Sequence, residues 1–198
     1  MKDVIGDNLE IADWMAFGLP KDNVSINSAL LVTRSLQNPM MIDPQLQASK
    51  WLKNMMKQFD LVSLKTGTDN FLKQLESALR MRHPIMIETS DPSIDPSISP
   101  LVAKEYETTN NRHFVRLGEN RIEVEPDLKI YMFTKLSNPP FDPDYYIKLC
   151  VINFTVTPTG LEDQLLAVVV ENELPEIETK KRELVEVISK GKNTLQKN

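Results

Sequence analysis

Short apolar runs alternate with longer amphipathic stretches along most of this chain. The short runs are too brief for helices and predict strands at residues 40–42, 60–65, 85–88, 129–136 and 151–156. In the stretches between them, apolar residues recur three and four positions apart, as in helices with one buried face. Strands that alternate with helices predict an α/β fold, with a parallel five-stranded sheet and helices on both faces.

Helices are predicted at residues 23–35, at 44–59, between Asp69 and His83, at 142–149 and from 159 onward. Asp43 has a side chain that can cap the second of these, with Pro44 at the first helical position, where its missing N–H is not needed. The buried face of that helix is expected to carry Trp51, Leu52, Met55, Met56 and Phe59. Further caps are expected at Asp69, at His83 and at the capping-box pair Thr159 and Glu162.

The remaining segments define the domain organisation. Residues 1–22 read as an irregular lead-in, 23–174 as one α/β domain, and 175–198 as a helical extension with fewer apolar residues and with i,i+4 ion pairs such as Glu178–Arg182. Residues 91–100 are rich in proline and serine and predict a loop. Residues 113–125 alternate about Gly118 and predict a β-hairpin, with Phe114, Val115 and Leu117 on one side and Ile122 and Val124 on the other.

Composition narrows the class of protein. An apolar fraction of 41% supports a sizeable core, and a net charge of −5 argues against nucleic acid or an anionic membrane as the main partner. The single cysteine, Cys150, excludes an internal disulfide and is typical of a reducing compartment. No segment approaches the ~20 apolar residues that cross a bilayer. These features predict a cytoplasmic protein.

The turn after the first predicted strand is where a phosphate loop would lie, and it has the wrong chemistry for one. Such loops follow G-x-x-x-x-G-K-[ST] and hold phosphate with backbone N–H groups. Here the turn reads Asp43, Pro44, Gln45. The carboxylate repels phosphate, and proline has no N–H to donate. Gly191 is followed by Lys192, but Asn193 comes next and Glu186 stands where the first glycine is needed. The sequence contains no standard phosphate loop.

Several segments, taken in order, identify a family. The most specific are residues 41–45 (Met-Ile-Asp-Pro-Gln) and 160–166 (Gly-Leu-Glu-Asp-Gln-Leu-Leu), and others are residues 18–20, 47–51, 133–139 and 153–157. Together they resemble dynein heavy chain over roughly residues 14–184, and within it the fifth of the six AAA+ modules of the motor ring. The resemblance implies the large subdomain of an AAA+ module with a P-loop NTPase-like fold and a degenerate phosphate loop.

The resemblance also implies a function. The fifth module is structural, follows the microtubule-binding stalk, and leads through its last helix toward the small subdomain and the buttress coiled coil. Its expected partners are the fourth and sixth modules of the same chain and the stalk and buttress, with the microtubule reached only indirectly. No cofactor is expected in this module, because ATP and magnesium belong to its neighbours. The chain is then a fragment of an ATP-hydrolysing motor that is cytoskeletal and, among such heavy chains, most often axonemal.

Residual sites can be named from the same resemblance. The vestigial nucleotide positions are Asp43, Pro44, Gln45, Glu88, Thr134 and Asn138. Glu88 ends the third strand, where an AAA+ ATPase places the acid that handles magnesium and water, and Thr134 and Asn138 lie where a γ-phosphate sensor would be. Loop capping and strand-end hydrogen bonding account for these residues better than catalysis does. Arg112, Arg116 and Arg121 on the hairpin are candidate contacts to a neighbouring module, against the simpler reading of a solvated surface.

The sequence departs from the family pattern at three places. Gln37-Asn38 replace Arg-Trp before the first strand, Glu88-Thr89-Ser90-Asp91-Pro92 replace Glu-Asn-x-x-Glu, and Asn138-Pro139-Pro140-Phe141 replace Asn-Pro-His-Tyr. These changes weaken the case for a surviving nucleotide pocket. Two alternatives stay open at this point. One is an active NTPase with an unorthodox phosphate site that uses Glu88 and Asn138. The other is a free-standing adaptor that shares the fold.

Overall fold

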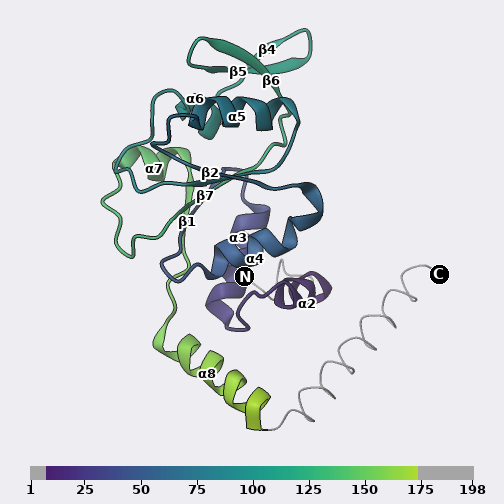
Figure 1. Ribbon diagram of the computed structural model, residues 1–198, viewed down its shortest axis with the longest axis vertical. Helices are drawn as coiled ribbons and strands as arrows, with labels where there is room; N and C mark the ends of the chain where they lie inside the picture. Colours follow the sequence, from purple (N-terminus) through teal and green to yellow (C-terminus); the bar gives the residue numbers. More distant parts are fainter. Residues whose placement is uncertain (1–7, 174–198) are drawn as a thin grey trace, which may run out of the picture.

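The computed structural model describes residues 8–173 (Figure 1). The predicted extension at 175–198, with its pair Glu178–Arg182, lies outside the described residues, and so do the first residues of the predicted lead-in. Residues 8–173 fold around a central sheet with helices above and below it, and a second, smaller sheet lies at one end (Figure 1).

The central sheet has five parallel strands, as the sequence predicts. They are β1 (Pro39–Ile42), β2 (Val62–Lys65), β3 (Ile85–Glu88), β7 (Ile130–Thr134) and β8 (Cys150–Asn153). Their spatial order is β2-β3-β7-β1-β8, so the first strand pairs with the fourth and fifth strands of this sheet rather than with the second. The chain therefore crosses the sheet after β1, which creates a reversal of strand order in its middle.

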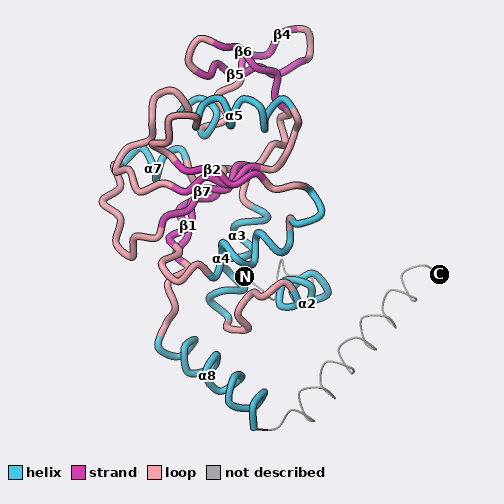
Figure 2. The backbone as a smooth tube through the Cα atoms, viewed as in Figure 1, coloured by secondary structure: helices cyan, strands magenta, loops and turns pink. Residues whose placement is uncertain are grey.

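Helices cover both faces of this sheet, which confirms the second part of the fold prediction (Figure 2). One face is packed by α2 (Asn8–Ala16), α3 (Asn23–Arg34) and α4 (Gln47–Met55). The other is packed by α5 (Phe71–Arg80), α6 (Ser99–Val102) and α7 (Pro143–Lys148). Neighbouring residues of a strand point to opposite faces, so Met41 joins the first of these cores and Met40 the second. The central strands are apolar on both sides for this reason.

The second sheet lies between β3 and β7 in sequence and is antiparallel. It contains β4 (Glu107–Thr109), β5 (Arg112–Leu117) and β6 (Asn120–Val124), in that spatial order. The β5–β6 pair is the predicted hairpin. The predicted faces are wrong in part, because Val115 pairs with Ile122 and both are buried, whereas Phe114 lies on the opposite, solvent-facing side under Arg121.

Several predicted boundaries are wrong. The lead-in is not irregular throughout, since α2 contributes Ile11 and Trp14 to the core. The loop at 91–100 ends in the short helix α6. Phe59 lies in a 3-10 turn, η1 (Lys57–Phe59), and is 54% exposed rather than buried. Helix α5 has no side-chain cap from Asp69, because its first residue follows Asn70.

The expected cap at His83 is made by its backbone. The His83 N–H donates to the Ala78 carbonyl at 3.1 Å and the Arg82 N–H to the Leu79 carbonyl at 3.1 Å. With Arg82 in the left-handed region at φ +59°, this is the Schellman arrangement that ends many helices. Helix α5 therefore ends where predicted.

Helix α8 (Pro158–Glu173) leaves the body of the domain (Figure 1). Its cap is Thr157, whose hydroxyl accepts the Gly160 N–H at 3.1 Å, and not the predicted Thr159. Gln47 on α4 donates its side-chain amide to Gln164 at 2.9 Å. Four large aliphatic side chains of α8 are about half to two-thirds exposed: Leu161, Leu165, Leu166 and Val169. An apolar stripe on one helix is typical of a surface that packs against another helix.

Asn38 joins four segments at the amino end of the sheet and is fully buried. Its side-chain oxygen accepts the Ile130 N–H at 3.0 Å, and its side-chain amide donates to the Val102 carbonyl at 2.9 Å. Its own carbonyl accepts the Cys150 N–H at 3.0 Å. The side chain thus satisfies backbone groups that water cannot reach.

Replacing Asn38 by alanine is expected to lower the free energy of unfolding by about 2 kcal/mol, because a buried N–H and a buried carbonyl lose their partners. Urea unfolding followed by circular dichroism measures the loss. The matched control is Asn138→Ala, at an exposed asparagine, which is expected to stay within about 0.5 kcal/mol of the native chain. Equal effects for the two variants would contradict the assigned role of Asn38.

Candidate functional site

The reversal of strand order puts the candidate site at the carboxyl ends of β1 and β7. The chain leaves β1 toward α4 on one face of the sheet, and leaves β7 toward α7 on the other. In open α/β sheets, ligands bind in the crevice that forms where the connections after two adjacent strands leave toward opposite faces of the sheet. The Asp43 N–H donates to the Thr134 carbonyl at 2.9 Å. The hydrogen bonding between β1 and β7 therefore continues to the residue that follows β1.

Asp43 fills this corner with its own carboxylate. The residue is fully buried, and its side chain accepts three hydrogen bonds: from the Gln47 N–H at 2.8 Å, the Ser49 N–H at 2.8 Å and the Ser49 hydroxyl at 2.7 Å. The two N–H groups belong to the first turn of α4. Unpaired N–H groups at a helix start, together with the helix dipole, are what binds an anion in a phosphate loop.

The turn is built differently from the prediction, although the role of Asp43 as a cap holds. Helix α4 begins at Gln47, so Pro44 lies before the helix and not at its first position. Leu46 adopts the left-handed conformation at φ +58°, which a glycine would adopt without strain. Gln45 is exposed. Because Pro44, Gln45 and Leu46 separate Asp43 from the start of α4, the Asp43 side chain can accept hydrogen bonds from the first N–H groups of that helix.

Glu88 is the second predicted site residue, and it is neutralised by two lysines. The Lys135 ammonium contacts its two carboxylate oxygens at 2.9 and 3.0 Å, and the Lys65 ammonium lies 3.7 Å from one of them. The three residues come from the carboxyl ends of β3, β7 and β2, which are neighbours in the sheet. Both carboxylate oxygens of Glu88 are therefore engaged by side chains of the chain itself.

Thr134 and Asn138 are not brought together. Thr134 is buried at the end of β7, and its hydroxyl accepts the Leu136 N–H at 3.3 Å, which caps the strand end. Asn138 is exposed in the loop that follows. The strand-end hydrogen bonding expected of Thr134 is confirmed.

The three hairpin arginines are exposed on β5 and β6. The second sheet, to which these strands belong, lies at one end of the domain, away from β1 (Figure 1). Arg121 contacts Glu107 at 3.3 Å and lies 4.2 Å above the Phe114 ring. Arg112 lies 3.6 Å from Glu123. Arg116 is paired in register with Arg121, and within residues 8–173 it has no ion-pair partner.

Other site types are not supported by the described residues. Over residues 8–173 there is no group of three or more His, Cys, Asp or Glu side chains placed to hold a metal ion. In the same part of the chain, no helix has the length and apolar character needed to span a bilayer. Cavities of about 330 and 250 Å³ open on the surface elsewhere, and neither is lined by Asp43 or Glu88.

Comparison with known proteins identifies the family. Residues 12–198 match the family described as the ATP-binding dynein motor region. The chain belongs to this dynein motor family. It is 40% identical over 191 residues to human dynein axonemal heavy chain 3, and 38% identical over 192 residues to human dynein axonemal heavy chain 6. It is 37% identical over 185 residues to the 1-beta heavy chain of the flagellar inner arm I1 complex of Chlamydomonas reinhardtii.

These matches cover nearly all of this chain but little of the relatives. They include 96%, 97% and 93% of the chain, and only 5%, 5% and 4% of the three heavy chains. The chain thus corresponds to one segment of a dynein motor region, and its five-stranded parallel α/β sheet is an AAA+ fold.

Sequence reasoning missed the partners that complete this site. Ser49 was not singled out, although it supplies two of the three hydrogen bonds to Asp43. Lys65 and Lys135 were not connected to Glu88. The lysines had a signal, because Lys65 is the last residue of a predicted strand, Lys135 is the last but one of another, and parallel strands bring their carboxyl ends to one edge of the sheet. Ser49 had none, since a serine inside a predicted helix is ordinary.

Proposed function

We propose that this chain is a non-catalytic, structural AAA+ module of a dynein heavy chain, the fifth in the motor ring. It does not hydrolyse ATP itself. It packs between the fourth and sixth modules and relays their rearrangements to the buttress and stalk, while ATP and magnesium act in neighbouring modules. The parent protein is an ATP-driven microtubule motor, which this module serves without touching the microtubule.

The observation that carries the proposal is the buried carboxylate of Asp43. It accepts hydrogen bonds from two N–H groups at the start of α4. A phosphate would therefore have to displace an anion that is covalently attached to the chain, and would have to enter beside its negative charge. Both changes are unfavourable. The description of the family as ATP-binding applies to the family, and the residues of this chain do not fit a bound nucleotide.

The relay role has a physical basis in the two cores. Apolar side chains fill both faces of the sheet, and close-packed interiors move as one body rather than deforming continuously. Helix α8 leaves this body with an exposed apolar stripe, which supports a second packing partner beyond the domain. The contacts of Arg112, Arg116 and Arg121 with a neighbouring module stay a prediction.

The place of action is proposed from the relatives. The human relatives are named axonemal heavy chains, and the algal one is named for a flagellar inner arm complex. A cytoskeletal, axonemal location follows for this chain if its parent is a motor of the same kind. Neither nucleic acid nor a membrane is part of this proposal.

Titration of the 198-residue chain with Mg-ATP in a calorimeter is expected to give no saturable heat below millimolar ligand, because the N–H groups that would hold phosphate are occupied. A phosphate-release assay on the same chain is expected to stay at the buffer rate, both for the native chain and for Glu88→Gln. A micromolar dissociation constant, or a release rate that Glu88→Gln abolishes, would instead establish the alternative of an active NTPase with an unorthodox site.

A further inference from the structure

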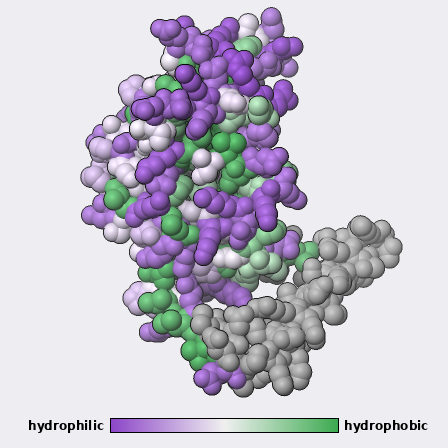
Figure 3. Space-filling model, in the orientation of Figure 1, coloured by the Kyte–Doolittle hydropathy of each residue, from purple (hydrophilic) through white to green (hydrophobic). Residues whose placement is uncertain are grey.

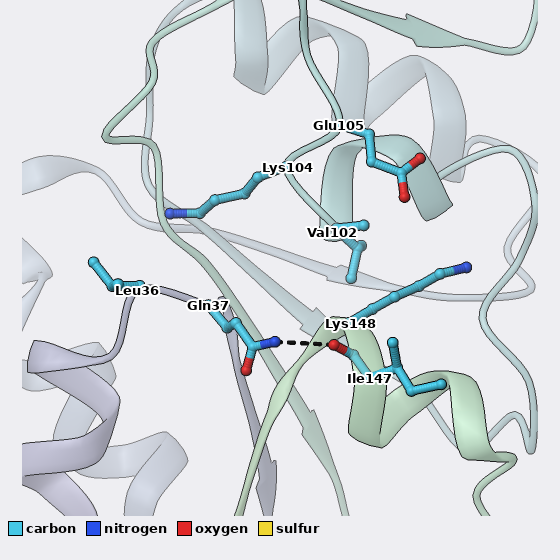
Figure 4. A pocket seen from close by; sticks show the side chains of 8 residues that line it. Leu36, Gln37, Val102, Lys104, Glu105, Ile147 and Lys148 are labelled. Atoms are coloured by element: carbon cyan, nitrogen blue, oxygen red, sulfur yellow. Dashed lines mark hydrogen bonds between the residues drawn. The ribbon is translucent and has the colours of Figure 1, made fainter.

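The cavity of about 330 Å³ lies at the opposite end of the sheet from Asp43, near the amino ends of β1 and β8 (Figure 4). Three segments form it: the link from α3 to β1, the end of α6 and the end of α7. Its lining includes Leu36, Gln37, Val102, Lys104, Glu105, Ile147 and Lys148. We call it the Leu36–Ile147 groove.

The walls of the groove are apolar and unusually exposed. Leu36 is 90% exposed and Ile147 69% exposed, while Val102 between them is buried (Figure 4). Two large aliphatic side chains therefore stand in water on either side of Val102 and the Gln37 side chain (Figure 4). Covering them removes apolar surface from water, at roughly 25 cal/mol for each Å². Both residues line one cavity, and apolar side chains that gather at one place on a surface are characteristic of interaction sites.

Side-chain amides connect the segments that form the groove. Gln37 donates to the Ile147 carbonyl at 2.9 Å (Figure 4), and Asn38 donates to the Val102 carbonyl at 2.9 Å. These bonds fix the α3–β1 link to α7 and to α6. A partner that enters does not have to order the walls, which lowers the entropic cost of binding.

The groove carries a positive side chain, Lys104, whose charge is not balanced by an ion pair within residues 8–173. The Lys104 side chain reaches over the cavity toward Leu36, whereas Glu105 and Lys148 point the other way (Figure 4). Lys148 is engaged by Asp144 and Ser99. Lys104 has no ion-pair partner within residues 8–173, and its backbone is fixed at φ +58° because the Glu105 N–H donates to the Pro100 carbonyl at 2.8 Å.

A second lysine, Lys129, adds to the positive charge near the groove. Lys129 donates its ammonium to the Thr33 carbonyl at the end of α3. Burial lowers the pKa of Lys129, and the charges of Lys104 and Arg34 lower it further. Arg34 is paired with Glu10. An added carboxylate beside Lys104 would therefore relieve repulsion as well as form an ion pair.

We propose that the Leu36–Ile147 groove docks a protein segment that inserts one large aliphatic side chain between Leu36 and Ile147 and presents a carboxylate to Lys104. A cavity of this size has room for one or two aliphatic side chains, and an apolar centre with a charged rim is the usual anatomy of a protein interface. The inference does not depend on the proposed structural role, since it uses a different end of the sheet.

The test follows methyl groups by NMR in the isotopically labelled 198-residue chain. The probe is a synthetic helical peptide with one leucine and with glutamates three and four positions from it, in an alanine–glutamine background. Saturable shifts are expected at the methyls of Leu36, Val102 and Ile147. Lys104→Glu is expected to weaken binding about tenfold, and a peptide with lysines in place of the glutamates is expected to bind Lys104→Glu better than it binds the native chain.

Controls separate specific docking in the groove from non-specific charge attraction. Lys73→Glu changes an exposed lysine on α5 and is expected to leave binding unchanged, while a native-like methyl spectrum verifies that each variant is folded. The proposal is overturned if the acidic peptide gives no saturable shifts at the three methyls. It is also overturned if the lysine peptide binds the native chain equally well, or if anionic lipid vesicles alone produce the same shifts.

Discussion

Replacing Asp43 by alanine is expected to lower the free energy of unfolding by about 3 kcal/mol. The substitution removes three hydrogen bonds to a buried carboxylate, and leaves two N–H groups at the start of α4 without a partner. Hydrogen bonds to charged groups contribute about 1.5–3 kcal/mol each, but the losses are not additive within one site. Urea unfolding measures the effect. Asp69→Ala, at an exposed aspartate without a capping bond, is the matched control and is expected to change stability by less than about 0.5 kcal/mol.

A second measurement distinguishes an occupied anion site from a merely stabilising residue. In the Asp43→Ala chain the freed N–H groups form an anion site at a helix start. Inorganic phosphate should therefore raise the melting temperature of this variant more than that of the native chain, when compared with chloride at equal ionic strength. Identical phosphate effects in the two chains would mean that the carboxylate does not occupy an anion position.

Replacing Trp51 by alanine is expected to lower the free energy of unfolding by about 4 kcal/mol, a large share of the stability of a single domain. Trp51 is fully buried on α4. Its ring meets Trp14 edge-on at 5.8 Å between centroids and lies 6.5 Å from Phe154. It thereby joins α2, α4 and the end of β8, and its loss leaves a cavity among all three. Thermal and urea unfolding both measure the change.

Two further variants test whether the expected loss comes from the buried position of Trp51. Trp51→Phe is expected to cost only about 1 kcal/mol, because the indole N–H has no hydrogen-bond partner among the described residues and its removal offsets part of the lost packing. Phe59→Ala changes a residue that the helical spacing places on the same face but that is mostly exposed, and it is expected to be nearly neutral. A cost for Phe59→Ala as large as that for Trp51→Ala would contradict the described end of α4.

The central sheet could be predicted from the sequence because its central strands are apolar on both sides and its helices on one. Met40, Met41 and Ile42 form a run too short for a helix, and the same holds for Ile85, Met86 and Ile87. Strand β4 gave no such signal, since Glu107, Thr108 and Thr109 are all polar and exposed. Pairing with β5 alone makes that segment a strand, and pairing partners are not visible in a local pattern.

The candidate site was predictable in its chemistry and not in its geometry. The residue types Asp43 and Pro44 were enough to show that this turn lacks the standard phosphate-loop pattern. The position of the helix start was not, because the Asp43 N–H continues the ladder to Thr134 and so keeps the chain extended one residue beyond the strand. The turn then needs Leu46 in a left-handed conformation, and a leucine side chain does not indicate that conformation.

Gln47 is bonded in two directions, through its backbone N–H to Asp43 and through its side chain to Gln164 on α8. A force applied along α8 therefore arrives at the carboxyl edge of the sheet through groups of the polypeptide itself. Under the proposed structural role, this connection between α8 and the sheet needs no bound nucleotide, because both of its hydrogen bonds are made by groups of the chain itself.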